Sequence, residues 1–198
     1  MKKYCLISIM LSMIFIVSSL AGDAMTDLKV NIDTVIDMIK NKEKASTPEE
    51  KAIQRKKIFE IAQNLFNFTE MSKRTLGKDW KQLSPEKQKQ FSDLFARFLA
   101  NIYYQRLGEY TNEKVKYLGQ RQHKNKSLVK TVIVTQKNEI PMDYKMLKTD
   151  KWRIYDVSIE GVSLIQNYRS QFHKILRTQG FDNLMTMMTK KLGQFSEL

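Results

Sequence analysis

The side chains that could perform acid–base or nucleophilic chemistry are few and widely spaced. Asp156 and Glu160 lie four residues apart in a segment with strand-like alternation, which separates the two carboxyl groups by about 13 Å. Paired glycosidase carboxylates are roughly 5–10 Å apart, so structural polar contacts are the better interpretation of this pair. Ser163 lacks the Gly-x-Ser-x-Gly surroundings of a nucleophilic serine. We expect it to cap the helix that follows.

Metal and phosphate chemistry also lack the residues that they need. His123 lies in a basic loop whose cations repel a metal ion, and His173 lies beside Lys174 on a segment with helical periodicity. Neither histidine has a cysteine or carboxylate at ligand spacing, and no glycine-rich phosphate loop occurs. The sequence therefore predicts no catalytic site, no metal and no cofactor, and we expect that the protein is not an enzyme.

The first 21 residues have the three parts of a secretory signal. Lysines follow Met1, residues 6–20 are uncharged and apolar, and small residues precede position 22. The apolar run is too short to span a bilayer comfortably, although an uncleaved anchor is the alternative. Cys5 precedes this run, which argues against a lipoprotein signal. We predict a signal peptide over 1–21, export to a periplasm and one domain over 22–198.

Helical periodicity dominates the first half of the expected mature chain. Apolar spacing predicts helices over 25–40, 48–67 and 69–76, and a long helix from Pro85 to about Gly108. Thr47-Pro48-Glu49-Glu50 has the pattern of a capping box with proline in the first turn. Residues 41–47 read as a polar linker, and Gly77 is suited to end the third helix.

The period then changes from helix-like to strand-like. Four strands are predicted over 114–118, 127–135, 140–148 and 151–160, with short polar connections that favour an antiparallel meander. Helical spacing returns at Leu164, ends at Gly180 and resumes after Asp182. This order predicts an α+β domain in which helices cover the apolar side of the sheet.

The charge is strongly basic: 34 Lys and Arg against 21 Asp and Glu give a formal net charge of +13 in 198 residues. Removal of two lysines with the signal would leave +11 (13 − 2). The cations are scattered in pairs and triplets, which fits a solvated surface or attraction to anionic lipid and acidic protein surfaces. Nucleic acid is an improbable partner for an exported protein without a recognisable binding module.

Several late methionines suit either a core or an adaptable cavity.

Long segments of the chain resemble the MlaC family, also called toluene-tolerance auxiliary proteins. The resemblance is carried by residues 151–172 (KWRIYDVSIEGVSLIQNYRSQF), 175–184 (ILRTQGFDNL), 76–80 (LGKDW) and 83–86 (LSPE), together with the signal peptide. It implies an NTF2-like fold in which helices pack on a curved four-stranded antiparallel sheet and enclose an apolar cavity. It also implies a periplasmic phospholipid carrier of the Mla pathway, which maintains the lipid asymmetry of the outer membrane.

The same resemblance implies partners and a site. The expected partners are phospholipid as cargo, an inner-membrane ABC transporter complex with an MCE-domain subunit, and an outer-membrane complex of a lipoprotein and a porin. Arg153 and Arg169 are candidates for contact with a headgroup or a partner. An exported lipid-acting hydrolase and a periplasmic adaptor without a lipid cavity are the alternatives. The expected acyl-chain contacts are Val132, Met142, Tyr144, Met146, Val157, Ile159, Leu164, Tyr168 and Phe172.

Overall fold

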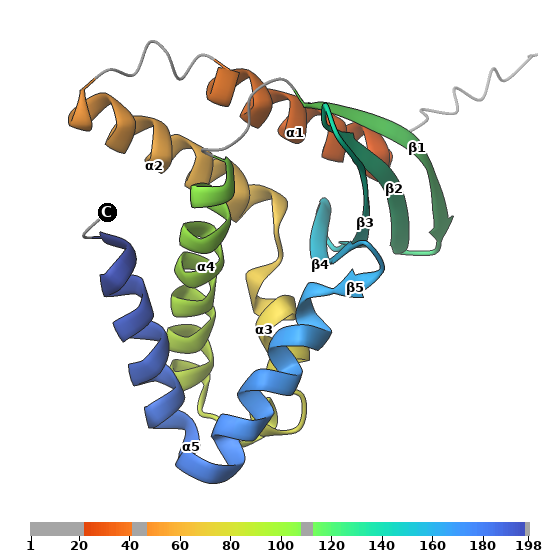
Figure 1. The fold of residues 1–198 in the computed structure, drawn as a ribbon. Coiled ribbons are helices and arrows are strands. Elements are labelled where there is room, and N and C mark those ends of the chain that lie inside the picture. The colour runs from red at the N-terminus through yellow and green to blue at the C-terminus, as the bar shows by residue number, and fades with distance from the viewer. Residues whose placement is uncertain (1–21, 41–46, 108–112, 197–198) are drawn as a thin grey trace, which may run out of the picture.

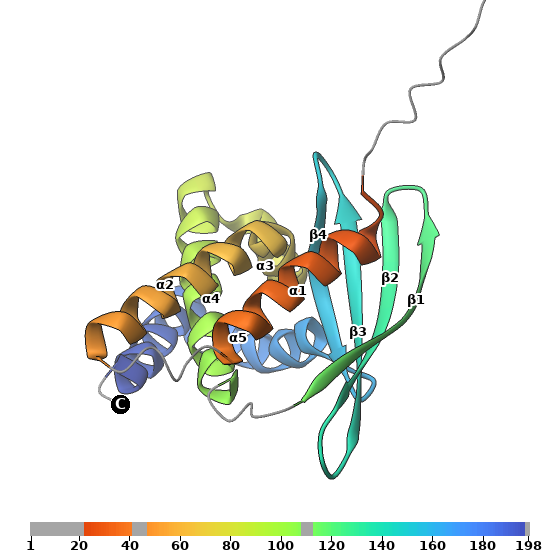
Figure 2. The same ribbon diagram turned by 90° about the horizontal axis from the view of Figure 1, so that it is seen from above.

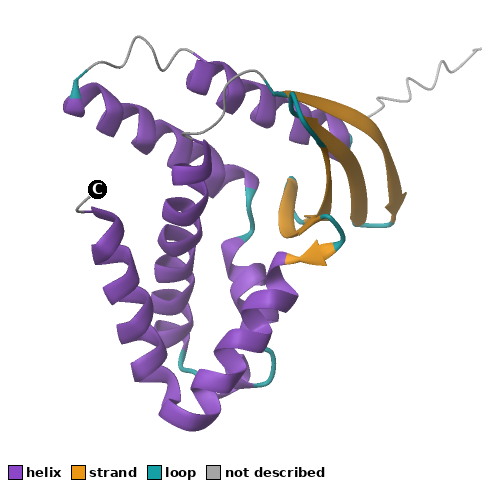
Figure 3. Ribbon diagram, viewed as in Figure 1, coloured by secondary structure: helices purple, strands orange, loops and turns teal. Residues whose placement is uncertain are grey.

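Helices flank a single antiparallel sheet in the computed structural model, which describes residues 22–40, 47–107 and 113–196. The predicted signal peptide, most of the predicted linker and Gly108 lie outside the described residues. The helices are α1 (Ala24–Lys40), α2 (Pro48–Leu65), α3 (Phe68–Leu76), the short 3-10 helix η2 (Asp79–Gln82), α4 (Pro85–Leu107) and α5 (Leu164–Ser196). The strands are β1 (Lys114–His123), β2 (Lys126–Val134), β3 (Glu139–Lys148), β4 (Trp152–Ile159) and β5 (Val162–Ser163). Figure 3 shows this division into helical and strand regions.

Local caps explain where the early helices begin and end. The Thr47 hydroxyl accepts a hydrogen bond from the Glu50 N–H at 3.2 Å, and the Glu50 carboxylate accepts one from the Thr47 N–H at 3.1 Å. This confirms the predicted capping box of α2. The Asn67 side chain caps α3 by accepting a hydrogen bond from the Glu70 N–H at 2.9 Å. Gly77 ends that helix with a φ of 60°, a conformation that glycine adopts without strain.

The sheet is an antiparallel meander in the order β1-β2-β3-β4-β5. The expected α+β fold is confirmed, but the described residues form five strands instead of four, since Val162 and Ser163 pair with the end of β4. Strand β1 also continues to His123, where a polar connection was expected. A tight turn with Lys124 at a φ of 53° joins it directly to β2.

Two apolar clusters form the interior. The helical cluster joins α3, η2, α4 and α5 and contains the buried side chains of Phe91, Phe95 and Leu184. The sheet cluster joins α1, the end of α2 and strands β2 to β4, with Leu28 and Val129 fully buried in it. Phe66 packs against both clusters.

Helix α1 and helix α5 occupy different sides of this arrangement. Figures 1 and 2 show α1 lying across β1 to β3, while α5 leaves β5 and runs away from those strands beside α3 and α4. Gly180, with φ 80° and ψ 177°, interrupts α5. The second half of α5 therefore folds back along α4 (Figure 1), so that Leu184 and Met188 enter the helical cluster.

Candidate functional site

The sheet brings five of the predicted acyl-chain residues together. The register places Met142 opposite Ile159 and Tyr144 opposite Val157. Residues directly opposite in an antiparallel pair project to the same face. Tyr144, Met146 and Val157 are buried, and Met142 and Ile159 pack against them. These side chains face α1 and the end of α2, so they belong to the interior of the sheet cluster.

Tyr144 contributes a phenol that stays neutral in this apolar setting. Burial raises the pKa of Tyr144 from 10.0 to about 12, and a hydrogen bond with Thr131 opposes this effect only in part. The hydroxyl also lies 3.9 Å from the Met142 sulfur. The face that carries Tyr144 is therefore uncharged at neutral pH and suited to apolar contacts.

Val132 does not join this group. It pairs with Pro141, whereas its neighbour Thr131 pairs with Met142. Because successive side chains of a strand alternate between faces, Val132 projects to the outer face of the sheet. The sequence placed Val132 with Met142 and Tyr144 as an acyl-chain contact, but the register puts Val132 on the opposite face.

The remaining predicted residues, Leu164, Tyr168 and Phe172, lie in the helical cluster. The Tyr168 ring meets the Phe95 and Phe98 rings edge to face, with centroids 5.6 and 5.7 Å apart. The helix that carries them leaves the sheet, so the nine predicted residues do not line one surface. They divide between the two clusters, with Val132 outside both.

The junction between the clusters is the segment that joins α2 to α3. Phe66 forms an isolated parallel bridge with Ile154, and the Asn67 N–H donates to the Ile154 carbonyl at 2.8 Å. The Phe66 and Phe68 rings stack with centroids 5.6 Å apart. This short segment therefore holds the edge of β4 and places two phenyl rings between the clusters.

A pocket of about 350 Å³ opens at this junction. Three phenyl rings and Ala96 supply its apolar lining, while the guanidinium groups of Arg97 and Arg153 and the Asp93 carboxylate supply charge. Seven of its eleven lining residues are polar or charged, a larger share than in a typical ligand pocket, which is mostly apolar. The full lining is Phe59, Gln63, Phe66, Asn67, Phe68, Thr69, Ser92, Asp93, Ala96, Arg97 and Arg153.

Arg153 is the predicted site residue that lines this pocket. Its side chain is 27% exposed, and one guanidinium nitrogen lies 2.9 Å from the Asp150 carboxylate. The Thr149 hydroxyl, followed by backbone N–H groups, lowers the pKa of Asp150 to about 2. Asp150 is therefore ionised at neutral pH and forms an ion pair with Arg153 beside the pocket.

Arg169 lies elsewhere, against the C-terminal end of α3. A Cβ added at Gly77 would lie 3.0 Å from a terminal guanidinium nitrogen of Arg169. Arg169 therefore lies beside Gly77, where a cation is favourable at the helix C-terminus. It is not among the residues of the junction pocket.

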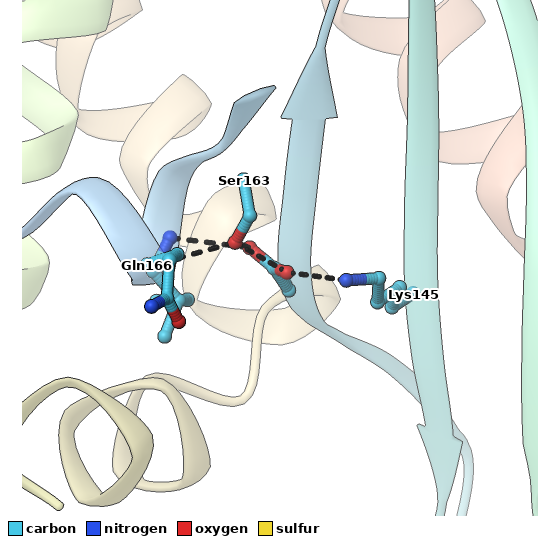
Figure 4. Close-up of polar contacts among 5 residues, drawn as sticks. Lys145, Ser163 and Gln166 are labelled. Carbon is cyan, nitrogen blue, oxygen red and sulfur yellow. Dashed lines mark hydrogen bonds and ion pairs between the residues drawn. The ribbon is translucent and has the colours of Figure 1, made fainter. Parts of the chain in front are cut away.

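The polar residues around the start of α5 form a structural network (Figure 4). The Ser163 hydroxyl lies 2.8 and 2.9 Å from the two Asp156 oxygens and accepts from the Gln166 N–H at 3.1 Å. Asp156 also accepts from the Ile165 N–H and pairs with Lys145 at 2.9 Å. The predicted roles of Ser163 as a helix cap and of Asp156 in structural contacts are confirmed.

We also searched the described part of the chain for metal sites and for membrane-spanning helices. Within 22–40, 47–107 and 113–196, no group of three or more His, Cys, Asp or Glu could hold a metal ion. His173 is exposed on α5, and its Nδ1 lies 3.9 Å from an Asp79 oxygen. Among the same residues, none of the helices has the length and apolar character needed to cross a membrane.

Comparison with known proteins identifies the family. The family model described as MlaC protein matches residues 29–190. The chain belongs to the MlaC family. A curated MlaC relative, the intermembrane phospholipid transport system binding protein of Haemophilus influenzae, is 27% identical over 128 residues, which cover 61% of this chain and 60% of the relative. The chain thus matches less than two thirds of that relative's length.

A solved structure shows the same fold. It is the phospholipid-binding protein from Ralstonia solanacearum in complex with a phospholipid, with a TM-score of 0.76 and 23% identity. The match covers 88% of this chain and 99% of the other. This MlaC chain therefore has the helix and sheet arrangement of that protein.

Sequence reasoning missed most of the junction pocket. Phe59, Phe66, Phe68 and Arg97 were not among the predicted site residues, because they read as helix-face and linker positions. One available signal was Asn67, a helix-capping residue between two phenylalanines. A helix start at Asn67 is consistent with the observed contact between the Phe66 and Phe68 rings on either side of it.

Proposed function

We propose that the protein is a periplasmic phospholipid carrier that moves glycerophospholipids between outer- and inner-membrane components of the Mla pathway and so maintains outer-membrane lipid asymmetry. Membership of the MlaC family supports this proposal. The named function of the Haemophilus relative and the lipid in the Ralstonia complex support it further. The observation in this chain that carries it is the pocket at the junction of two apolar clusters, with Arg153 beside three phenyl rings.

The physical need for such a carrier follows from the cargo. Two sixteen-carbon acyl chains contain roughly 28 methylenes, and exposing them to water costs on the order of 20 kcal/mol at about 0.8 kcal/mol each. A protein that encloses the tails removes most of this barrier. Apolar side chains of both clusters would contact the tails, and Arg153 would pair with the headgroup phosphate.

The size of the pocket bears on how the lipid enters. At about 350 Å³ the pocket lies near the lower end of the roughly 300–1,000 Å³ range for drug-sized ligands, and a two-chain phospholipid is larger than such ligands. In the proposed function, loading widens the junction, and side chains such as Met142 and Tyr168 become tail contacts. The partners offer the lipid an apolar path while the junction is open. These are the proposed transporter complex with an MCE-domain subunit and the proposed complex of a lipoprotein and a porin.

A hydrolase has less support in this geometry. The Ser163 oxygen is engaged with Asp156 and with the Gln166 N–H, which is the bonding of a helix cap. The proposed function is accordingly binding and transfer without a chemical step.

The experiment that tests the proposal is native mass spectrometry of protein recovered under mild conditions from cells that express the full chain, followed by solvent extraction of the lipid. We expect a bound glycerophospholipid. Ala96→Phe, which fills the pocket, should reduce lipid recovery, whereas Ala52→Phe adds the same volume on an exposed part of α2. Folded protein without lipid, both as purified and after incubation with phospholipid vesicles, would contradict the proposal.

A further inference from the structure

The outer face of strands β1 to β3 is the surface opposite α1. Val129 and Tyr144 are paired across β2 and β3 and are buried towards α1, so the alternate pair, Leu128 and Lys145, points away from it. Figures 1 and 2 show α1 on the inner side of these strands, while α2, α3 and α5 contact β4. The start of α5 reaches the outer face at the β4 edge, where Asp156 joins Ser163 to Lys145. The described helices leave the rest of the outer face of β1 to β3 open.

Cations are concentrated at one end of this face. The register sets Arg121 beside Leu128 and Lys145 in one row, and His123 beside Lys126 and Leu147 in the next. Lys130 lies in the adjoining row, opposite Asp143. We call this set the basic face, defined as Arg121, His123, Lys126, Leu128, Lys130, Asp143, Lys145 and Leu147.

Most of these cations are not neutralised within the protein. Lys145 is paired with the buried Asp156. Arg121, Lys126 and Lys130 are exposed, and among the described residues no carboxylate forms an ion pair with them. Asp143 is the acidic member of the basic face. The face thus presents unpaired positive charge around two half-buried leucines.

The composition of the basic face favours a lipid surface over a protein partner. Cores of protein interfaces are enriched in aromatic side chains and depleted in lysine, whereas the basic face has three lysines and no Phe, Tyr or Trp. Exposed cations around a small apolar centre fit the diffuse negative charge of an anionic bilayer, because lipid headgroups can move to meet them.

The basic face also adjoins the junction pocket. Arg153 pairs with Leu147 across β3 and β4, and it lines the pocket. We propose that the basic face docks the protein on the surface of an anionic phospholipid bilayer, with the pocket opening beside the headgroups. The purpose of docking rests on the proposed carrier function, but the docking step can be measured without lipid transfer.

The test is co-sedimentation with vesicles of an equal mixture of phosphatidylglycerol and phosphatidylcholine, compared with pure phosphatidylcholine. The protein is recovered from cells that express the full chain, and its N-terminus is verified. We expect binding to the anionic vesicles at low salt and loss at high salt. Combined Arg121→Gln, Lys126→Gln and Lys130→Gln should lower the partition coefficient about 100-fold, since each cation near the surface contributes about fivefold.

The matched control removes the same charge from α5, by Lys174→Gln, Lys190→Gln and Lys191→Gln. These lysines are exposed and lie away from the basic face, so we expect a change of no more than about twofold. Equal loss in both variants, or no binding of the unmodified protein to anionic vesicles, would overturn the proposal. Retention on immobilised polyglutamate that depends on the basic face, without vesicle binding, would assign the face to an acidic protein instead. Failure to recover lipid from protein that still binds vesicles would count against the carrier function alone.

Discussion

Asp156 joins the start of α5 to the sheet through one buried carboxylate. It is 4% exposed, and it engages Ser163, the Ile165 N–H and Lys145. Asp156 and Ser163 both lie in the segment that resembles the MlaC family, and this network gives each of them a structural role. Their role in the structure is to fix the direction in which α5 leaves β5.

We expect Asp156→Ala to lower the free energy of unfolding by about 2–3 kcal/mol, because the buried Ile165 N–H and the Ser163 hydroxyl lose their acceptor. Glu139→Ala removes the exposed pair with Lys116 and should cost less than about 1 kcal/mol. Urea unfolding of both variants measures the difference. Similar losses in the two variants would show that the Asp156 network contributes no more than a surface ion pair.

Tyr144 should make stability sensitive to alkaline pH. Burial raises its pKa from 10.0 to about 12, so the unfolded chain loses this proton at a lower pH than the folded protein. The associated stability is complete below pH 10 and is lost between about pH 10 and 12, at up to about 3 kcal/mol. Tyr144→Phe should lack this component.

Chemical unfolding at pH 9 and pH 11 tests the expected difference. The control is Tyr104→Phe. The Tyr104 ring, on α4, lies under the Arg55 guanidinium of α2. If Tyr144→Phe and the unmodified protein lose the same stability over this range, the hydroxyl is not buried as described.

The period of apolar residues predicted the helices and strands that bury one of their faces. Helices α1 to α4 and strands β2 to β4 were predicted within a few residues, because each alternates apolar and polar positions at its own period. The second half of β1 was missed. It is an edge strand with residues such as Arg121 and His123 exposed to water, so it carries no hydrophobic alternation. Strand β5 has two residues, too few for any period.

Gly180 divides α5 into two helical segments, and the second folds back along α4. Its φ of 80° and ψ of 177° lie in a region that is essentially restricted to glycine. No atom within 4 Å would meet an added Cβ at either Gly180 or Gly193. We expect Gly180→Ala to destabilise the protein by about 1–3 kcal/mol through backbone strain.

Gly193→Ala is the matched change within the regular part of α5 and should stabilise the protein by about 0.5–1 kcal/mol. Thermal unfolding should show a lower Tm for Gly180→Ala and a higher Tm for Gly193→Ala than for the unmodified protein. A neutral Gly180→Ala would mean that α5 continues without the interruption.

At the scale of the whole molecule, the candidate site was only partly predictable. Five predicted residues share the sheet cluster and three share the helical cluster, because apolar patterning identifies buried residues without stating which elements cover them. The sequence did not show that α1 covers the inner face of β1 to β3, while α5 contacts β4 and packs beside α3 and α4. The junction pocket depends on contacts between Phe66 and β4, which no local pattern encodes, although Arg153 was found.

Bound phospholipid should stabilise the whole protein. A ligand that binds only the folded state adds about 2.7 kcal/mol at 100 times its Kd. We expect delipidated protein to have a lower Tm and to recover it on addition of phospholipid, with a smaller recovery for Ala96→Phe than for Ala52→Phe. Differential scanning calorimetry provides the measurement. An unchanged Tm after verified removal and reloading of lipid would contradict a site at the junction.

The position of α1 across the sheet has a consequence for the order of folding. The Met25 N–H donates to the Gln120 side chain, 95 residues later in the chain, and Leu28 is buried in the sheet cluster. Helix α1 therefore lacks its sheet partner until a segment 95 residues later in the chain is available. The sheet cluster also needs β4, which ends at Ile159, so it is completed only after most of the chain is present.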